Sequence, residues 1–171
     1  FSQVQAGAEA AKHLLSRGRK RLAYIAAQLD PRVLQRGEGF RQVLKEQGVY
    51  DPALELQKPQ PSSIGLGGEL FMQLMTQHPD VDGVFFCNDD LAQGAALEAL
   101  RHGIAIPERV SLVGFNDLPG SAYMVPRLTS IRTPREQVGQ RAAQLLLGLI
   151  DGVTQKPQID LGFELVVRES S

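Results

Sequence analysis

Apolar runs and apolar stripes alternate along this chain. Nearly unbroken runs at 22–27, 84–87 and 110–115 have the length of strands and are rich in branched and aromatic residues. Runs without regular polar alternation are typical of strands buried on both faces, as in the middle of a parallel sheet. Shorter strands are predicted at 54–56, 128–131, 158–163 and 165–168.

Between these runs, apolar residues recur at the spacing of three and four that marks one face of a helix. Glycine or proline follows each such stretch, as expected where helices stop. The alternation of helices and strands predicts an α/β fold in which helices cover both faces of a parallel sheet. The predicted helices cover approximately 6–16, 33–47, 64–78, 90–102 and 134–150.

Polar residues stand where three of these helices begin. Ser62 and Ser63 can cap the helix that follows Pro61. Asp89 or Asp90 can cap the helix that follows the run at 84–87, and for Asp90 capping is preferred to ligand contact. Thr133 is expected to cap the last long helix, with proline in its first turn. A serine-capped helix start can also hold an anion through its free backbone donors.

Two of the long strands end in polar residues. Asn88 and Asp89 follow the run at 84–87, and Asn116 and Asp117 close the run at 110–115. In an open parallel sheet the carboxyl ends of the strands point to one edge, and ligands bind in the crevice outside it. We therefore expect a cleft that hydrogen-bonds a small polar molecule, with Asn88 as a contact because its amide offers a donor and an acceptor.

Arg36 lies near the start of the helix that follows the first long strand, so it can face the same crevice. Its planar guanidinium offers several donors suited to carboxylates and hydroxyls. The alternative is that Arg36 is an ordinary solvated charge on a helix surface. Helical periodicity alone does not decide between the two interpretations.

Composition narrows the class of protein. The chain carries 18 Lys and Arg against 19 Asp and Glu, a net charge of −1, which argues against a nucleic-acid-binding surface within these residues. The basic cluster at 17–21 resembles a nuclear-import or nucleic-acid patch, but the favourable placement of cations at a helix C-terminus is the preferred explanation. Cys87 is the single cysteine, which favours a reducing compartment, and no apolar stretch reaches membrane-spanning length. We expect a cytoplasmic protein that does not insert into a membrane.

Motifs for catalysis are missing from the sequence. It contains no G-x-S-x-G elbow, no H-E-x-x-H helix and no C-x-x-C pair. His13 falls within a predicted helix, while His78 and His102 fall at helix ends, where compensation of the helix dipole explains them. We therefore expect no enzymatic activity, no cofactor and no metal site.

Five short motifs follow one another in a fixed order along the chain, at 7–25, 36–44, 85–95, 106–117 and 126–131. The second reads R-x-x-G-F-x-x-V-L, the third F-F-C-N-D-D-L-A, and the fourth I-P-E-R-V-S-L-V-G-F-N-D. Together they resemble the effector-binding core of the lactose/galactose repressor (LacI/GalR) family of bacterial transcription regulators. Each motif is short, but their number, order and spacing over almost the whole chain make the resemblance specific.

The resemblance implies a periplasmic-binding-protein-like fold of two parallel-sheet lobes flanked by helices, with a sugar or nucleobase effector between the lobes. Residues 1–28 and 134–157 would form part of an incomplete N-terminal lobe, and 29–133 with 158–171 the C-terminal lobe. The helix-turn-helix headpiece that binds operator DNA would lie outside this chain. Helices in the incomplete lobe should then expose apolar side chains, namely Leu14, Leu15, Leu145 and Leu146.

By the same resemblance, Arg36, Asn88 and Asn116 match effector contacts of the family, and Asp117, Ser62 and Ser63 complete the expected site. Effector binding would control operator binding allosterically. The family also implies a homodimer, with the helices after Gly65 and Ala92 and the loop near Tyr123 as its surface.

Two departures from the family pattern bear on the ligand. The usual aspartate after the Gly-Phe pair is Asn116 here, and 61–63 reads Pro-Ser-Ser where several members place an aromatic residue. Losing a negative charge and an aromatic face while keeping Arg36 favours a polar, anionic ligand. Together with the Ile159–Phe163 ending, this is similar to the gluconate-type repressors, so a sugar acid such as gluconate is the expected effector.

Two other functions remain open at this point. A periplasmic sugar receptor of the same fold would require an export signal upstream of this segment. A small α/β enzyme would require a nucleophile beside a base, and the sequence offers none.

Overall fold

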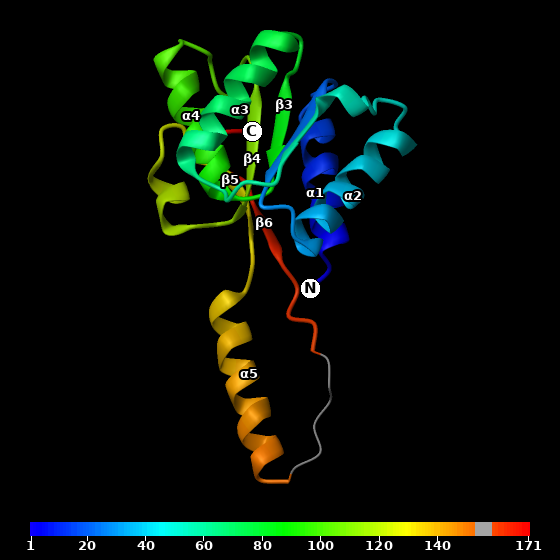
Figure 1. The fold of residues 1–171 in the computed structure, drawn as a ribbon, viewed down its shortest axis with the longest axis vertical. Helices are drawn as coiled ribbons and strands as arrows, with labels where there is room; N and C mark the ends of the chain where they lie inside the picture. Colours follow the sequence, from blue (N-terminus) through cyan, green and yellow to red (C-terminus); the bar gives the residue numbers. More distant parts are fainter. Residues whose placement is uncertain (153–158) are drawn as a thin grey trace.

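The structure is a computed structural model in which residues 1–152 and 159–171 are described (Figure 1). Helices and strands alternate from the N-terminus, as the hydrophobic pattern predicts. Two short 3-10 turns, Pro52–Leu54 and Pro119–Tyr123, lie in the connections. The elements in order are α1 (Gln3–Ser16), β1 (Leu22–Ala27), α2 (Pro31–Glu46), β2 (Glu55–Lys58), α3 (Ile64–Gln77), β3 (Gly83–Phe86), α4 (Asp89–Arg101), β4 (Ser111–Asn116), β5 (Thr129–Arg132), α5 (Arg135–Ile150) and β6 (Glu164–Val166).

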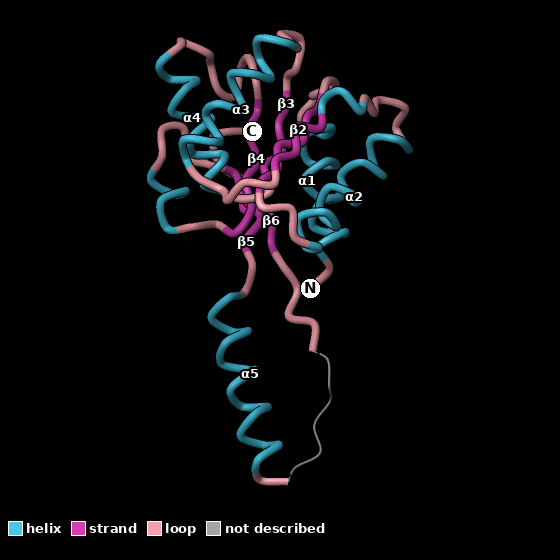
Figure 2. The backbone as a smooth tube through the Cα atoms, in the orientation of Figure 1, coloured by secondary structure: helices cyan, strands magenta, loops and turns pink. Residues whose placement is uncertain are grey.

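The strands form a single sheet at the centre of the molecule, in the order β2-β1-β3-β4-β5-β6 (Figure 2). The first five strands are parallel, and β6 runs antiparallel to β5 at the edge. The chain leaves β1 towards β2 in one direction and returns to place β3 on the other side. The carboxyl ends of β1 and β3 therefore flank the point where strand order reverses, which is where open α/β sheets bind ligands.

Helices α1 and α2 cover one face of the sheet, and α3 and α4 cover the other (Figure 1). All six residues of β1 are buried, as expected of a central strand covered on both sides. On the α2 side, the rings of Tyr24, Phe40 and Phe85 lie within 6.0 Å of one another, centroid to centroid. The prediction of an α/β fold with a mostly parallel sheet and helices on both faces is confirmed.

Helix α1 approaches α2 closely at two glycines. A Cβ atom added at Gly7 would lie 1.9 Å from the carbonyl oxygen of Arg36, and one at Gly39 would lie 1.8 Å from that of Val4. No side chain fits at either position, so the backbones meet directly. This contact brings the first turn of α1 against the second turn of α2.

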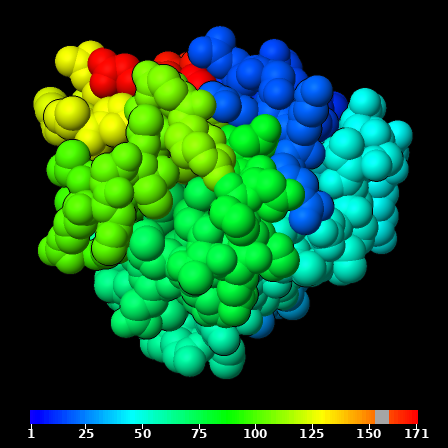
Figure 3. All heavy atoms as spheres, turned by 90° about the horizontal axis from the view of Figure 1, so that it is seen from above, coloured from blue at the N-terminus to red at the C-terminus, as the bar shows by residue number. Residues whose placement is uncertain are grey.

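Residues 1–28 do not form part of a separate lobe, so the predicted boundary is wrong. Strand β1 pairs with β2 and with β3 in the centre of the sheet, and Leu14 of α1 is fully buried. The space-filling view shows the N-terminal residues, in blue, packed against the rest of the body and next to the red C-terminal residues (Figure 3). Ser171 Oγ lies 2.8 Å from His13 Nε2. The boundary was wrongly predicted because hydrophobic periodicity does not reveal how closely α1 packs on α2 at the two glycines.

Helix α5 extends away from the body of the molecule (Figure 1). It has no buried residue, and Leu146 is 60 % exposed, as predicted, while Leu15 and Leu145 are half-buried. Its assignment to a second lobe stays a prediction, and residues 153–157 of that predicted segment lie outside the described residues.

Three local predictions are wrong. Residues 159–163 form no strand, and Gln158, the first residue of that predicted strand, lies outside the described residues. Asn88, not Asp90, caps α4, and α5 begins at Arg135 without a side-chain cap, so Thr133 does not serve as one.

In the described part of the chain, no helix combines the length and the apolar character needed to cross a bilayer.

Candidate functional site

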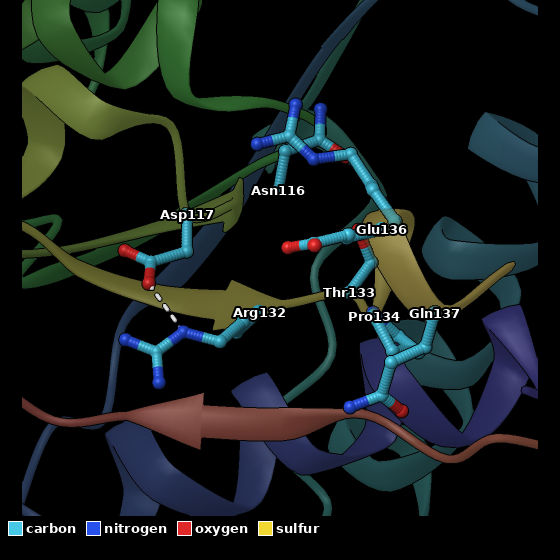
Figure 4. Close-up of a pocket in the computed structure, with 8 residues that line it drawn as sticks. Asn116, Asp117, Arg132, Thr133, Pro134, Glu136 and Gln137 are labelled. Atoms are coloured by element: carbon cyan, nitrogen blue, oxygen red, sulfur yellow. Dashed lines mark hydrogen bonds and ion pairs between the residues drawn. The ribbon is translucent and has the colours of Figure 1, made fainter. Parts of the chain in front are cut away.

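Two adjoining hollows lie at the carboxyl edge of the sheet, between the sheet and the start of α5. We call the first the arginine hollow, with a volume of about 390 Å³; the second, of about 660 Å³, is drawn in Figure 4. They share Asn116, Thr133 and Arg135. The arginine hollow is lined by Phe1, Gln3, Arg32, Arg36, Phe115, Asn116, Thr133, Arg135 and Val138. The second is lined by Asn116, Asp117, Arg132, Thr133, Pro134, Arg135, Glu136 and Gln137.

Arg36 is held rigidly in the arginine hollow. Its Nε donates a hydrogen bond to Gln3 Oε1 at 2.8 Å, and its Nη1 donates to the carbonyl oxygen of Cys87 at the end of β3. The guanidinium carbon lies 3.8 Å from the centroid of the Phe115 ring, a cation–π arrangement. Only 7 % of the residue is exposed. The interpretation of Arg36 as a solvated surface charge is therefore wrong.

The positive charge of Arg36 has no carboxylate partner in the described part of the chain. The neighbouring acid, Asp30, caps α2 and pairs with Arg32 at 2.7 Å. Burial lowers the pKa of the Arg36 guanidinium, yet an arginine stays protonated at neutral pH. A buried charge is costly unless it is paired, so the lining favours an anion in this hollow. It presents three arginines and no acidic residue.

Asn88 lies at the end of β3, next to the carbonyl group that accepts from Arg36. Its Oδ1 caps α4 by accepting from the Leu91 amide at 3.2 Å, and its Nδ2 donates to Ser62 Oγ at 2.6 Å. The amide is therefore engaged in local structure, and it links the loop before α3 to the start of α4. Ser63 caps α3 through the Leu66 amide and is exposed, as the sequence predicts.

Asn116 lines both hollows, and its backbone adopts φ of +103°, followed by +50° at Asp117. Asparagine and aspartate tolerate this left-handed region better than other residues with a Cβ. Figure 4 shows Asp117 turned towards Arg132 and Asn116 lying apart from that pair. The turn thus separates the two neighbours: Asp117 faces its arginines at the second hollow, while Asn116 lines both hollows.

Asp117 is fixed by two ion pairs, at 2.8 Å to Arg132 and 2.7 Å to Arg168. Burial alone would raise the pKa of its carboxyl, but the hydrogen bonds from these two arginines outweigh burial, so that the pKa is lowered. The carboxylate is 6 % exposed. It holds β4, β5 and the C-terminal segment together.

Asp89 is a fully buried carboxylate directly behind the site. It accepts hydrogen bonds from the Leu118 amide at 2.7 Å and from the hydroxyls of Ser121 and Ser130, each at 2.6 Å. Burial raises its pKa, and the two hydroxyls oppose that shift. Asp89 thus ties the loop after β4 and strand β5 to the start of α4.

The structure brings some of the predicted site residues together and not others. Arg36 and Asn116 line one hollow, Asn88 is adjacent through the Cys87 carbonyl, and Asp117 lines only the second hollow. Ser62 contacts Asn88, while Ser63 acts as a helix cap. Sequence reasoning missed Gln3, Arg32, Phe115 and Arg135. Of these, Arg135 could have been found, because it follows a strand at the carboxyl edge.

The arrangement is suited to binding through charge and hydrogen bonds. Within the described residues, no group of three His, Cys, Asp or Glu is placed to hold a metal ion. The arginines can bind a carboxylate, Asn116 and Thr133 can bind hydroxyls, and Phe115 offers an apolar face.

Comparisons with known proteins agree with this architecture. Residues 11–171 match the model of the family described as periplasmic binding protein-like domain. The chain is 63 % identical over 172 residues to the HTH-type transcriptional regulator GntR of Pseudomonas aeruginosa, covering all of this chain and 50 % of that protein. The chain spans about half the length of the curated relatives it matches.

Solved structures give the same result. The transcription regulator GntR from Chromobacterium violaceum superposes with a TM-score of 0.98 at 46 % identity, covering 100 % of this chain and 64 % of that one. The transcriptional regulator CelR in complex with cellobiose superposes with a TM-score of 0.90 at 30 % identity, covering 100 % and 53 %. These relatives are transcription regulators. The chain belongs to the family of periplasmic binding protein-like domains, in the form that LacI-family transcription regulators carry.

Proposed function

We propose that this chain is the ligand-sensing domain of a LacI/GalR-type transcription regulator and that its ligand is a small sugar or sugar acid, such as gluconate. The observation that carries the proposal is the buried guanidinium of Arg36, which has no carboxylate partner among the described residues and lines a hollow at the carboxyl edge of the sheet. An aldonate supplies both a carboxylate for the arginines and hydroxyls for Asn116. The cellobiose complex of a structural relative supports a sugar-like ligand.

In this proposal the ligand controls operator binding by a helix-turn-helix headpiece outside these 171 residues, in the cytoplasm. A ligand shifts a conformational equilibrium only as far as its affinities for the two states differ. The hollows lie between the sheet and the start of α5, so a change in the angle of α5 would alter their shape. The same coupling requires that operator DNA change the affinity for the ligand.

We further propose that the protein is a homodimer. Large apolar side chains are exposed on α4 and on the loop before β5: Leu97 is 49 %, Leu100 71 %, Tyr123 86 % and Val125 84 % exposed. Two apolar hollows lie among them. Exposed apolar side chains gathered in this way mark protein contact surfaces. This surface agrees with the one implied by the family resemblance, except that α3 contributes chiefly through Ile64.

A thermal-shift panel of neutral sugars, sugar acids and purines tests the ligand class, because a ligand that binds the native state raises the melting temperature. We expect gluconate or a related aldonate to give the largest shift. A panel in which only purines stabilise the protein would contradict the proposed ligand.

Arg36→Ala should weaken binding of the sugar acid about 10- to 100-fold, because a hydrogen bond to a charged group contributes about 1.5–3 kcal/mol. Isothermal titration calorimetry measures the change. Arg101→Ala is the matched control, since Arg101 is 73 % exposed on α4 and should leave affinity unchanged. Equal affinities of wild type and Arg36→Ala would remove Arg36 from the site.

A further inference from the structure

The two protein groups that hold Arg36 are both neutral. Nε donates to the side-chain carbonyl of Gln3 and Nη1 to the backbone carbonyl of Cys87. Within the described residues, Nη2 has no protein acceptor. The guanidinium is thus fixed in place by hydrogen bonds while its charge stays uncompensated.

The position of Gln3 follows from the packing of α1 on α2. Gln3 is the first residue of α1 and lies one turn before Gly7, on the same face of the helix. Gly7 rests directly on the backbone of Arg36, since a Cβ there would lie 1.9 Å from the Arg36 carbonyl oxygen. Ser2 caps the helix by accepting from the Gln5 amide at 3.2 Å. The close packing of the two helix backbones therefore places the side-chain amide of Gln3 beside Nε of Arg36.

A glutamate at position 3 would have the same length and could accept the same hydrogen bond. It would also place a carboxylate against the guanidinium, and an opposite charge at this distance pairs with it. The difference between glutamine and glutamate here is consequently one of charge and not of shape.

We propose that Gln3 is a positioning and specificity-determining residue: its neutral amide orients Arg36 without neutralising it, and so reserves the guanidinium for the carboxylate of the ligand. This inference rests on the proposed function, because it concerns the same site. The lining contains no acidic residue that could take that place. Gln3 itself lines the hollow, so a negative charge there would also face the ligand directly.

The test compares Gln3→Glu, Gln3→Leu and the control Gln5→Glu in the intact natural protein. Gln5 is exposed on the same turn of α1, so its substitution makes the same change in net charge away from Arg36. Two quantities are measured: the affinity for gluconate by calorimetry, and the melting temperature without ligand.

We expect Gln3→Glu to weaken gluconate binding at least tenfold while leaving the melting temperature unchanged or higher, because the buried charge becomes paired. Gln3→Leu should weaken binding by loss of orientation, and Gln5→Glu should leave the affinity for gluconate unchanged. These opposite effects on binding and stability separate a role in specificity from a merely structural one.

Gluconate affinity of Gln3→Glu within threefold of wild type would overturn the inference and leave the proposed function standing. So would a loss of affinity that is matched by a lower melting temperature, since Gln3 would then be structural. Binding of a neutral sugar but of no sugar acid by the wild type would likewise overturn only this inference. A wild type that binds no sugar and no sugar acid would overturn both.

Discussion

At the scale of single residues, Asn116 and Asp117 are neighbours whose side chains make different contacts. Both adopt positive φ, and the turn they make sends Asp117 to its two arginines and Asn116 to the hollows. The described lining of the arginine hollow carries no negative charge, and a carboxylate in the place of Asn116 would introduce one. The ion pairs of Asp117 thus hold the turn that places its neighbour, Asn116, at both hollows.

Asp117→Asn should lower the free energy of unfolding at neutral pH by roughly 1–3 kcal/mol. This is below the cost of about 3–5 kcal/mol for breaking a fully buried pair, because Arg132 is 49 % exposed. Asparagine tolerates the positive φ, so no new backbone strain is added. Urea denaturation measures the difference, with Glu69→Gln, an exposed acid on α3, as the control.

The same variant has a predictable pH dependence. Because the folded-state pKa of Asp117 is lowered, its stabilisation is complete above about pH 4, the ordinary range of an aspartate carboxyl. It is lost as the pH falls through the lowered pKa. The gap between wild type and Asp117→Asn should therefore narrow below about pH 4, and a gap that widened there would contradict the assignment.

The sequence predicted that Arg36 and Asn116 lie at one edge of the sheet, where they line the same hollow, but it did not predict their hydrogen-bond partners. Arg36 and Asn116 follow from the rule that ligands bind at the carboxyl edge. Gln3 could not be foreseen, because its neighbour is 33 positions away and the contact depends on how closely two helices approach. Asn88 was predicted as a ligand contact, and the structure shows its amide bonded to Ser62 and Leu91.

At the scale of elements, the contact of α1 with α2 decides the shape of the site. Gly7 and Gly39 allow the helix backbones to touch, and that approach carries Gln3 to Arg36. Periodicity located both helices, but the spacing between them depends on which residues lack a side chain. The error over residues 1–28 has the same origin, since a helix that packs this closely belongs to the body of the molecule.

Gly7→Ala should lower the free energy of unfolding by roughly 1–3 kcal/mol or more, because the added methyl group would overlap a backbone carbonyl that cannot move alone. Ligand affinity should fall with it, since the helices must separate. Gly139→Ala is the control: nothing lies within 4 Å of its added Cβ, and alanine favours a helix by up to about 1 kcal/mol. Equal stability of Gly7→Ala and wild type would show that the helices can part freely.

At the scale of the whole molecule, the apolar surface on α4 and the loop before β5 predicts association. Leu100→Glu should convert the proposed dimer to monomer, because Leu100 is 71 % exposed and borders both apolar hollows there. Sedimentation equilibrium measures the mass. Leu34→Glu on α2, 47 % exposed and away from this surface, should leave the mass unchanged. A Leu100→Glu protein of unaltered mass would place the dimer contact elsewhere.

Helix α5 is attached to the body only through neighbouring strands in the described part of the chain. The chain leaves along β5 and returns along β6, and the two pair at Ser130 with Val166, Ile131 with Leu165, and Arg132 with Glu164. At the last of these positions Arg132 also holds Asp117, the residue after Asn116. A torque applied to α5 is thus transmitted through these two paired strands, and their outermost residue pair, Arg132 with Glu164, borders the second hollow.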